Sequence, residues 1–187
     1  ALDFDSALQD LTTAAQVNAA DARPDPDLGL KIAKQQAAIH LRCNDLTAAQ
    51  EVWEKLLSAS PNNQLLLEDI IEQQVGEGLF RQAAEYSDRL LQITTDPYAM
   101  VVRQMRKADI LQKGGDLNTA LDVYSQTLPQ VGRDTWLERE LIARVEEVFQ
   151  REDDLVGMKD FLDQRIVAEP DRLALQKALA ATLEKVG

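Results

Sequence analysis

Apolar side chains recur along the chain at the three- and four-residue spacing of an α-helix, in one stretch after another. Pro and small polar residues mark helix starts, as in SPNN at 60–63 and TTDP at 94–97, and helix ends are marked by Asn44, Gly78 and Gly114-Gly115. Together these signals predict ten helices, near 3–20, 24–43, 46–59, 63–76, 78–94, 97–113, 116–129, 134–151, 153–168 and 171–186. Because the connecting loops are short, neighbouring helices are expected to be antiparallel.

Every second predicted helix has the same layout around one residue, which we call the anchor residue. An apolar side chain stands three residues before it and another eight residues after it, which indicates one buried stripe on each of these helices. The anchor residues are Ala7, Ala49, Ala83, Ala120 and Met158, at spacings of 42, 34, 37 and 38 residues. The chain is therefore predicted to be an array of helix pairs.

The period, the small anchor residue and a proline twelve residues beyond it resemble the tetratricopeptide repeat family. The clearest match is A-x3-W at Ala49 to Trp53, followed by Pro61. The resemblance implies an all-α fold: an α-solenoid of antiparallel helix hairpins, wound into a right-handed superhelix of about ten helices. The repeats are degenerate, since Met158 replaces the small anchor residue in the last of them.

The same register predicts one repeat domain over 1–187. It consists of the second helix of a truncated unit at 1–20, units near 24–61, 62–96, 97–132 and 133–170, and an unpaired helix at 171–187. Both end helices would lack a partner, which leaves uncovered the apolar residues Phe4, Leu8 and Leu11 at one end and Leu175, Leu179 and Leu183 at the other. Since a repeat array needs polar caps, we expect the sequence to be a piece of a longer protein.

Charge narrows the class of partner. With 32 acidic and 20 basic side chains the net charge is -12, which argues against nucleic acid and anionic lipid surfaces. The longest apolar runs, such as LLL at 65–67, are too short to span a bilayer. A protein or peptide partner, basic or neutral, is the remaining expectation.

Residues that carry chemistry are scarce. Cys43 is the only cysteine, which excludes a disulfide framework and fits a reducing compartment; the cytoplasm is favoured, while the location stays open. His40 is the only histidine and is expected to be packed and hydrogen-bonded. No catalytic, cofactor-binding or metal-binding residue is predicted, and Gly114-Gly115 lacks the Lys-Ser/Thr of a phosphate loop. Trp53 and Trp136 are expected in the core, and Cys43 is expected to be partly buried.

In the resembled family, ligands lie along a concave surface formed by the first helix of each pair. Carried over by position, the candidates here are Lys31, Lys34, Leu41, Leu65, Glu68, Glu72, Val102, Met105, Asp109, Gln112, Glu140 and Glu147. Their two basic and five acidic members give a charge of -3, which suits an extended peptide with basic and apolar side chains.

Two hypotheses about the function of the chain stay open. In the first, the chain is a non-catalytic interaction scaffold that binds a polypeptide along the groove. In the second, it is a structural spacer or oligomerisation segment of a larger protein that self-associates through its uncapped ends. A clamp of Lys, Asn, Asn, Lys and Arg that binds acidic C-termini in one subclass of the family is matched here only by Lys34 and Arg106.

Overall fold

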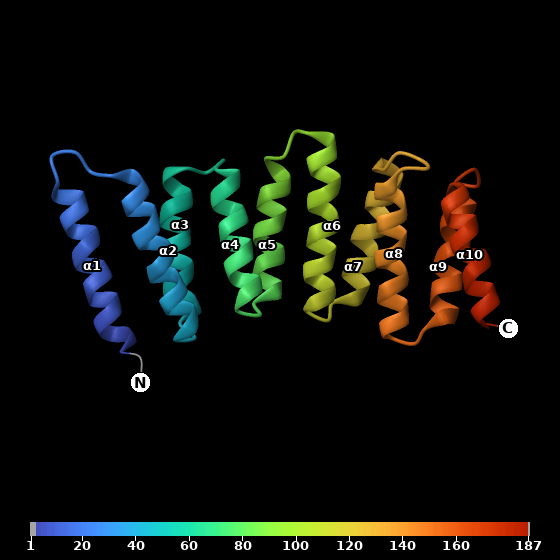
Figure 1. Ribbon diagram of the computed structural model, residues 1–187, viewed down its shortest axis with the longest axis horizontal. Helices are drawn as coiled ribbons and strands as arrows, with labels where there is room; N and C mark the ends of the chain where they lie inside the picture. The colour runs from blue at the N-terminus through green and yellow to red at the C-terminus, as the bar shows by residue number, and fades with distance from the viewer. Residues whose placement is uncertain (1–2, 187) are drawn as a thin grey trace. The chain divides into compact units, whose positions relative to one another are not determined.

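The computed structural model describes residues 3–186, which form ten α-helices, one 3-10 helix and no strand (Figure 1). The helices are α1 (Phe4–Ala20), α2 (Pro26–Arg42), α3 (Leu46–Ala59), α4 (Gln64–Gly76), α5 (Phe80–Gln92), α6 (Pro97–Lys113), α7 (Leu117–Thr127), α8 (Trp136–Arg151), α9 (Leu155–Ala168) and α10 (Leu173–Val186), with the 3-10 turn η1 (Leu128–Gln130) after α7. The prediction of an all-α chain is confirmed, and every predicted helix end agrees within two residues. Ala1, Leu2 and Gly187, which belong to the expected end segments 1–20 and 171–187, lie outside the described residues.

The helices fall into two compact units, Ala1–Leu79 and Phe80–Gly187. In the first unit α2 packs against both α1 and α3; in the second, α6 packs against both α5 and α7, and α9 packs against α10. The boundary between the units falls inside the expected repeat at 62–96. Within each unit consecutive helices alternate in direction, as short loops require (Figure 1).

One turn geometry joins the first and second helix of four successive pairs. A residue with positive φ follows the first helix, and the next residue donates its backbone N–H to a carbonyl five residues back, at 2.8 to 3.0 Å. The residues with positive φ are Asn44, Gly78, Gly115 and Asp153. This arrangement is the Schellman motif, so the repeat seen in the sequence is also a repeat of backbone geometry.

Carboxylates directly after three of these turns start the second helix. Asp45, Asp116 and Asp154 each accept a hydrogen bond from the backbone N–H three residues on, at 2.8 to 3.3 Å. Each bond satisfies one N–H that has no partner within its own helix. The predicted helix end at Gly115 is confirmed, whereas Asp153 plays the same part without a sequence signal as strong as glycine.

Four of the five anchor residues are buried, as the sequence predicts, whereas Ala7 in α1 is only partly buried. Ala49, Ala83 and Ala120 are at most 1% exposed, and Met158 is buried as well. One helical turn later Trp53, Tyr124 and Leu162 are also buried, as predicted for the inward stripe. The small anchor residues Ala49, Ala83 and Ala120 let neighbouring helices approach closely.

Four expectations about single residues are wrong. Trp136 is 58% exposed, because it is the first residue of α8 and the buried position of that turn is occupied by Leu137. Cys43 is exposed, because it caps the end of α2 outside the packed stripe. Leu175 is buried rather than uncovered, and Leu46 is 36% exposed although it stands three residues before an anchor residue.

Candidate functional site

Two helices of the second unit, α6 and α8, run in the same direction, because α7 between them is antiparallel to both (Figure 1). Each has a stripe that begins apolar and ends charged. The stripe of α6 holds Val102, Met105, Asp109, Gln112 and Lys113, and the stripe of α8 holds Trp136, Glu140, Arg144, Glu147 and Arg151. The two stripes line adjoining cavities, which together we call the α6–α8 groove.

The charged end of the groove is a cavity of about 320 Å³ lined by Asp109, Gln112, Lys113, Glu140, Arg144, Glu147 and Arg151. Arg144 contacts carboxylates on both helices. The guanidinium donates to Asp109 from Nη1 and to Glu140 from Nε, the latter at 3.1 Å. One arginine thereby compensates two carboxylates on the two walls of the cavity.

Asp109 also accepts a hydrogen bond from the hydroxyl of Tyr124, which does not line the cavity and donates at 2.5 Å. Burial raises the pKa of Asp109 above its ordinary value of 3.8, although the bond from Tyr124 and the charge of Arg144 act to lower it. Burial and the bond to Asp109 also raise the pKa of Tyr124, which keeps its hydroxyl protonated as a donor.

The apolar end of the groove is a cavity of about 100 Å³ lined by Val102, Met105, Trp136, Leu137, Glu140 and Arg144. Glu140 and Arg144 line both cavities, which makes the groove continuous from the first turns of α6 and α8 to their last.

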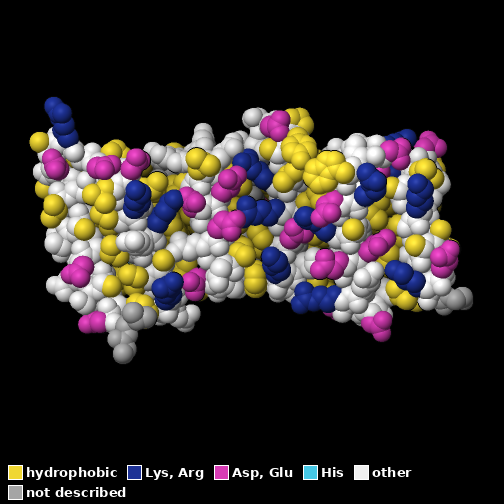
Figure 2. Space-filling view, in the orientation of Figure 1, with side chains coloured by type: hydrophobic (Ala, Val, Ile, Leu, Met, Phe, Trp, Pro, Cys, Tyr) yellow, Lys and Arg dark blue, Asp and Glu magenta, His cyan; other side chains and the backbone are white. Residues whose placement is uncertain are grey.

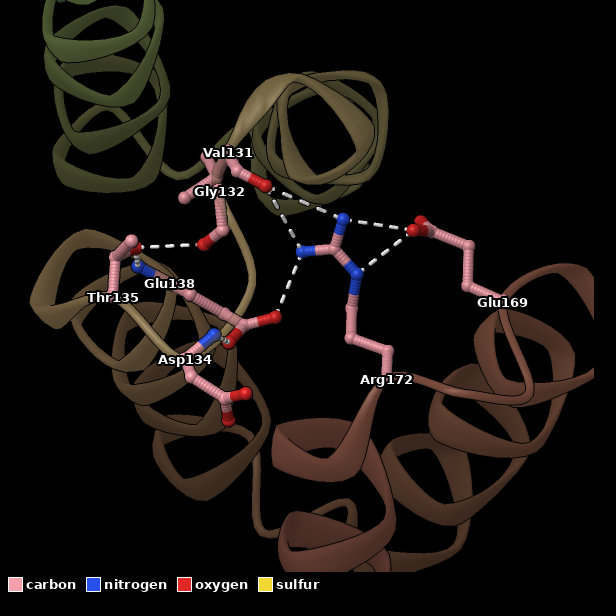
Figure 3. A network of polar contacts seen from close by, with 7 residues as sticks. All are labelled: Val131, Gly132, Asp134, Thr135, Glu138, Glu169 and Arg172. Atoms are coloured by element: carbon pink, nitrogen blue, oxygen red, sulfur yellow. Dashed lines mark hydrogen bonds and ion pairs between the residues drawn. The ribbon is translucent and has the colours of Figure 1, made fainter.

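A buried network fixes the first turn of α8, and with it the apolar end of the groove (Figure 3). Arg172, from the loop between α9 and α10, donates to Glu138 at 2.8 Å and to Glu169, and both of its terminal nitrogens approach the carbonyl of Val131. The second carboxylate oxygen of Glu138 accepts from the backbone N–H of Asp134 at 2.8 Å.

The backbone N–H of Glu138 in turn donates to the Thr135 hydroxyl, which caps the helix. Since Glu138 is fully buried and Arg172 is 2% exposed, this network is structural, and it holds the loop before α8 against the loop before α10.

A third cavity, of about 400 Å³, lies outside the groove, between α8 and α10. Its α10 wall is made of Ala174, Ala178 and Ala181 with Lys177, and it contains none of the twelve candidate residues.

The twelve candidates fall into two groups. Six of them line the α6–α8 groove: Val102, Met105, Asp109, Gln112, Glu140 and Glu147. The other six belong to α2 and α4 of the first unit. Lys31 is exposed, Leu65 is 73% exposed, and Lys34 forms an ion pair with Asp69. Leu41 is 8% exposed and lines neither cavity of the groove; Gln112 and Met105 of the groove are similarly buried, at 8% and 2% exposed. Glu68 is partly buried, and Glu72 is exposed.

Sequence reasoning missed four residues of the groove. We number each repeat unit so that its anchor residue is the twentieth; the ligand positions of the resembled family are then the second, fifth, ninth and twelfth. Trp136 precedes the first position of its unit, Arg144 stands at the sixth, and Lys113 and Arg151 stand at the thirteenth. One signal was present, because Glu140 and Arg144 are four residues apart and of opposite charge. With these residues included, the charged cavity has three acids and three bases.

Other kinds of site have little support in the described part of the chain. No three His, Cys, Asp or Glu side chains converge there as metal ligands would. None of the helices is both long and apolar enough to cross a bilayer. His40 has one ring nitrogen 3.9 Å from an oxygen of Asp45 and remains partly exposed.

No family model and no curated protein matches the chain. Among solved structures, the chain is similar to the N-terminal domain of stress-induced protein-1 (STI-1) from C. elegans, with 16% sequence identity and a TM-score of 0.44. That similarity covers 74% of this chain and 96% of the other. At this TM-score the similarity supports no inference about the fold or the ligand.

Proposed function

We propose that the chain is a tetratricopeptide-like interaction module that works without catalysis and binds a polypeptide in the α6–α8 groove. The observation that carries the proposal is the convergence of six candidates, chosen from the sequence by repeat position, on two adjoining cavities. Concave sites lined by apolar side chains and a few placed polar groups are the usual form of a binding site.

An extended segment suits the dimensions of the groove. From Val102 to Gln112 the rise along α6 is about 15 Å, which an extended chain covers in about five residues. Because Arg144 already compensates Asp109 and Glu140, we propose a polypeptide ligand without the strong preference for basic side chains that the twelve candidates alone predict.

The experiment is a selection from random peptides of about 12 residues, which span about 40 Å when extended, on the full chain. The selected peptides are then tested by fluorescence anisotropy against Glu147→Lys in the groove and against Asp122→Lys on α7. Asp122 is exposed and does not line either cavity of the groove, so it controls for the change in net charge.

We expect Glu147→Lys to change affinity by at least about fivefold, in the direction set by the charge of each peptide, and Asp122→Lys by less than about twofold. Failure to select any peptide, or equal effects of the two variants, would refute the groove as a binding site.

The competing function is self-association, favoured by Leu173 and Leu183 of α10, which are 48% and 45% exposed. Sedimentation over a range of concentrations separates the two functions. A dimer that Leu183→Glu disperses, together with an inert groove, would establish the oligomerisation segment instead.

A further inference from the structure

Three large apolar side chains are exposed to solvent at the apolar end of the α6–α8 groove. Trp136 is 58% exposed, and on α6 Tyr98 and Val102, one helical turn apart, are 57% and 38% exposed. Figure 2 shows an apolar patch near the beginnings of α6 and α8. Exposed apolar patches often mark interaction sites, and tryptophan is enriched among the residues that contribute most to binding.

The charges next to this cavity identify the chemistry of its occupant. Glu140 and Arg144 are the charged residues of its lining, and Arg144 is held by both Asp109 and Glu140. A charged side chain entering here would compete with these ion pairs and lose its own hydration. An apolar side chain covers the cavity and leaves both pairs intact.

Size gives a second constraint. A volume of about 100 Å³ is well below the ~300–1,000 Å³ of a typical small-molecule pocket, so it suits one side chain better than a separate small-molecule ligand. The occupant is thus one side chain of a longer molecule.

We infer that the cavity formed by Val102, Met105, Trp136 and Leu137 receives a single aliphatic or aromatic side chain of the polypeptide bound in the groove, with the Trp136 ring packed over it. This inference rests on the proposed function and adds the determinant of specificity. The rest of the peptide runs toward the charged cavity, and contacts it within about five residues of the inserted side chain.

The first measurement uses Trp136 as its own reporter in the full chain. Trp53 is fully buried, so iodide reaches Trp136 preferentially. Binding of a selected peptide is expected to shift the emission of Trp136 to shorter wavelength and protect it from iodide. Emission and quenching that stay unchanged at saturation would overturn the inference.

The second measurement identifies the side chain. Trp136→Ala is expected to weaken binding by about tenfold or more, whereas Val167→Ala, at an 84% exposed position of α9, changes it by less than about twofold. Alanine at one apolar position of the peptide produces the same loss, and combining it with Trp136→Ala adds little further. Additive losses at every peptide position would overturn the inference.

The last measurements are the salt dependence of binding and the oligomeric state of the chain. An apolar contact predicts that the loss of affinity caused by Trp136→Ala is the same, within about threefold, at about 50 and about 500 mM NaCl. If Trp136→Ala has no effect while Glu147→Lys does, the inserted side chain is refuted and the proposed function stands. If the chain dimerises and protects Trp136 without peptide, the occupant is a second copy and the inference fails.

Discussion

At the scale of single residues, Gly114 and Gly115 look alike in the sequence but meet different requirements. Gly115 has a φ of +83°, which glycine adopts without strain, while Gly114 has an ordinary φ of -76°. A Cβ on Gly114 would lie 2.8 Å from the Cβ of Phe80, at the start of α5. Gly114 is therefore required for close packing.

Gly114→Ala is expected to lower the free energy of unfolding by about 1–3 kcal/mol, because Phe80 Cβ moves only together with its backbone. Gly76→Ala is the matched control: it ends α4, and a Cβ there meets nothing within 4 Å. Alanine at Gly76 should be neutral or stabilising by up to about 1 kcal/mol. Urea unfolding followed by circular dichroism measures both, and equal effects would contradict the packing role of Gly114.

The protonation of Asp109 makes the stability of the folded chain depend on pH. Because burial raises its pKa above 3.8, the folded chain binds this proton more tightly than the unfolded chain does. Its contribution to stability is therefore largest below the ordinary value and falls as pH rises through the raised pKa. The free energy of unfolding of the wild type should fall relative to that of Asp109→Asn as the pH rises from about 4. Once Asp109 is ionised in the folded chain, the difference between the two free energies should stay constant. Urea titrations at a series of pH values check this, and a difference that rises with pH would contradict it.

At the scale of elements, the turn between α8 and α9 places two aspartates in opposite roles. Asp153 has a φ of +54°, where a side chain is strained, and Asp154 caps α9 through the N–H of Gly157. Asp153→Gly is expected to stabilise the chain by about 0.5–1 kcal/mol, and Asp154→Ala to destabilise it by about 0.5–2 kcal/mol. Thermal unfolding of the two variants gives the signs, and the same sign for both would refute this account of the turn.

The network around Arg172 connects two loops and the first turn of α8. Arg172→Met leaves the buried Glu138 carboxylate without its cation, and is expected to cost about 3–5 kcal/mol. Arg81→Met is the control, since Arg81 is 91% exposed and pairs with Glu85 one turn away, where the loss should stay below about 1 kcal/mol. Chemical denaturation measures both. A small effect of Arg172→Met would mean that water reaches Glu138 in the folded chain.

The bounds of the helices could be predicted from the sequence more completely than the residues of the α6–α8 groove. Helix bounds follow from local signals that the sequence contains, such as Asp116 after Gly115 or Pro97 at the start of α6. The groove depends on which face of α6 meets which face of α8. The ligand positions of the resembled family select Val102 and Met105 but not Trp136, which precedes the repeat register, or Arg144, whose position is set by its contact with Asp109 on another helix.

At the scale of the whole molecule, the division into two units locates the proposed function. All residues of the α6–α8 groove, the network that fixes α8 and Tyr124, which donates to Asp109, belong to Phe80–Gly187. The first unit contributes α1 to α4, where the candidate Leu41 is buried and Lys34 is paired with Asp69. The binding function is therefore expected to reside in the second unit.

A fragment of residues 80–187 tests this expectation. Because these residues form a compact unit with its own buried core, from Ala83 to Ala178, the fragment should fold with the helix content of α5 to α10. It should bind the peptides selected on the full chain with a Kd within about threefold of the full-chain value, since a threefold change is only about 0.7 kcal/mol. Circular dichroism and calorimetry measure the two properties separately. A folded fragment that has lost binding would show that the first unit supplies part of the site, and an unfolded fragment would show that the boundary at Phe80 does not separate independent units.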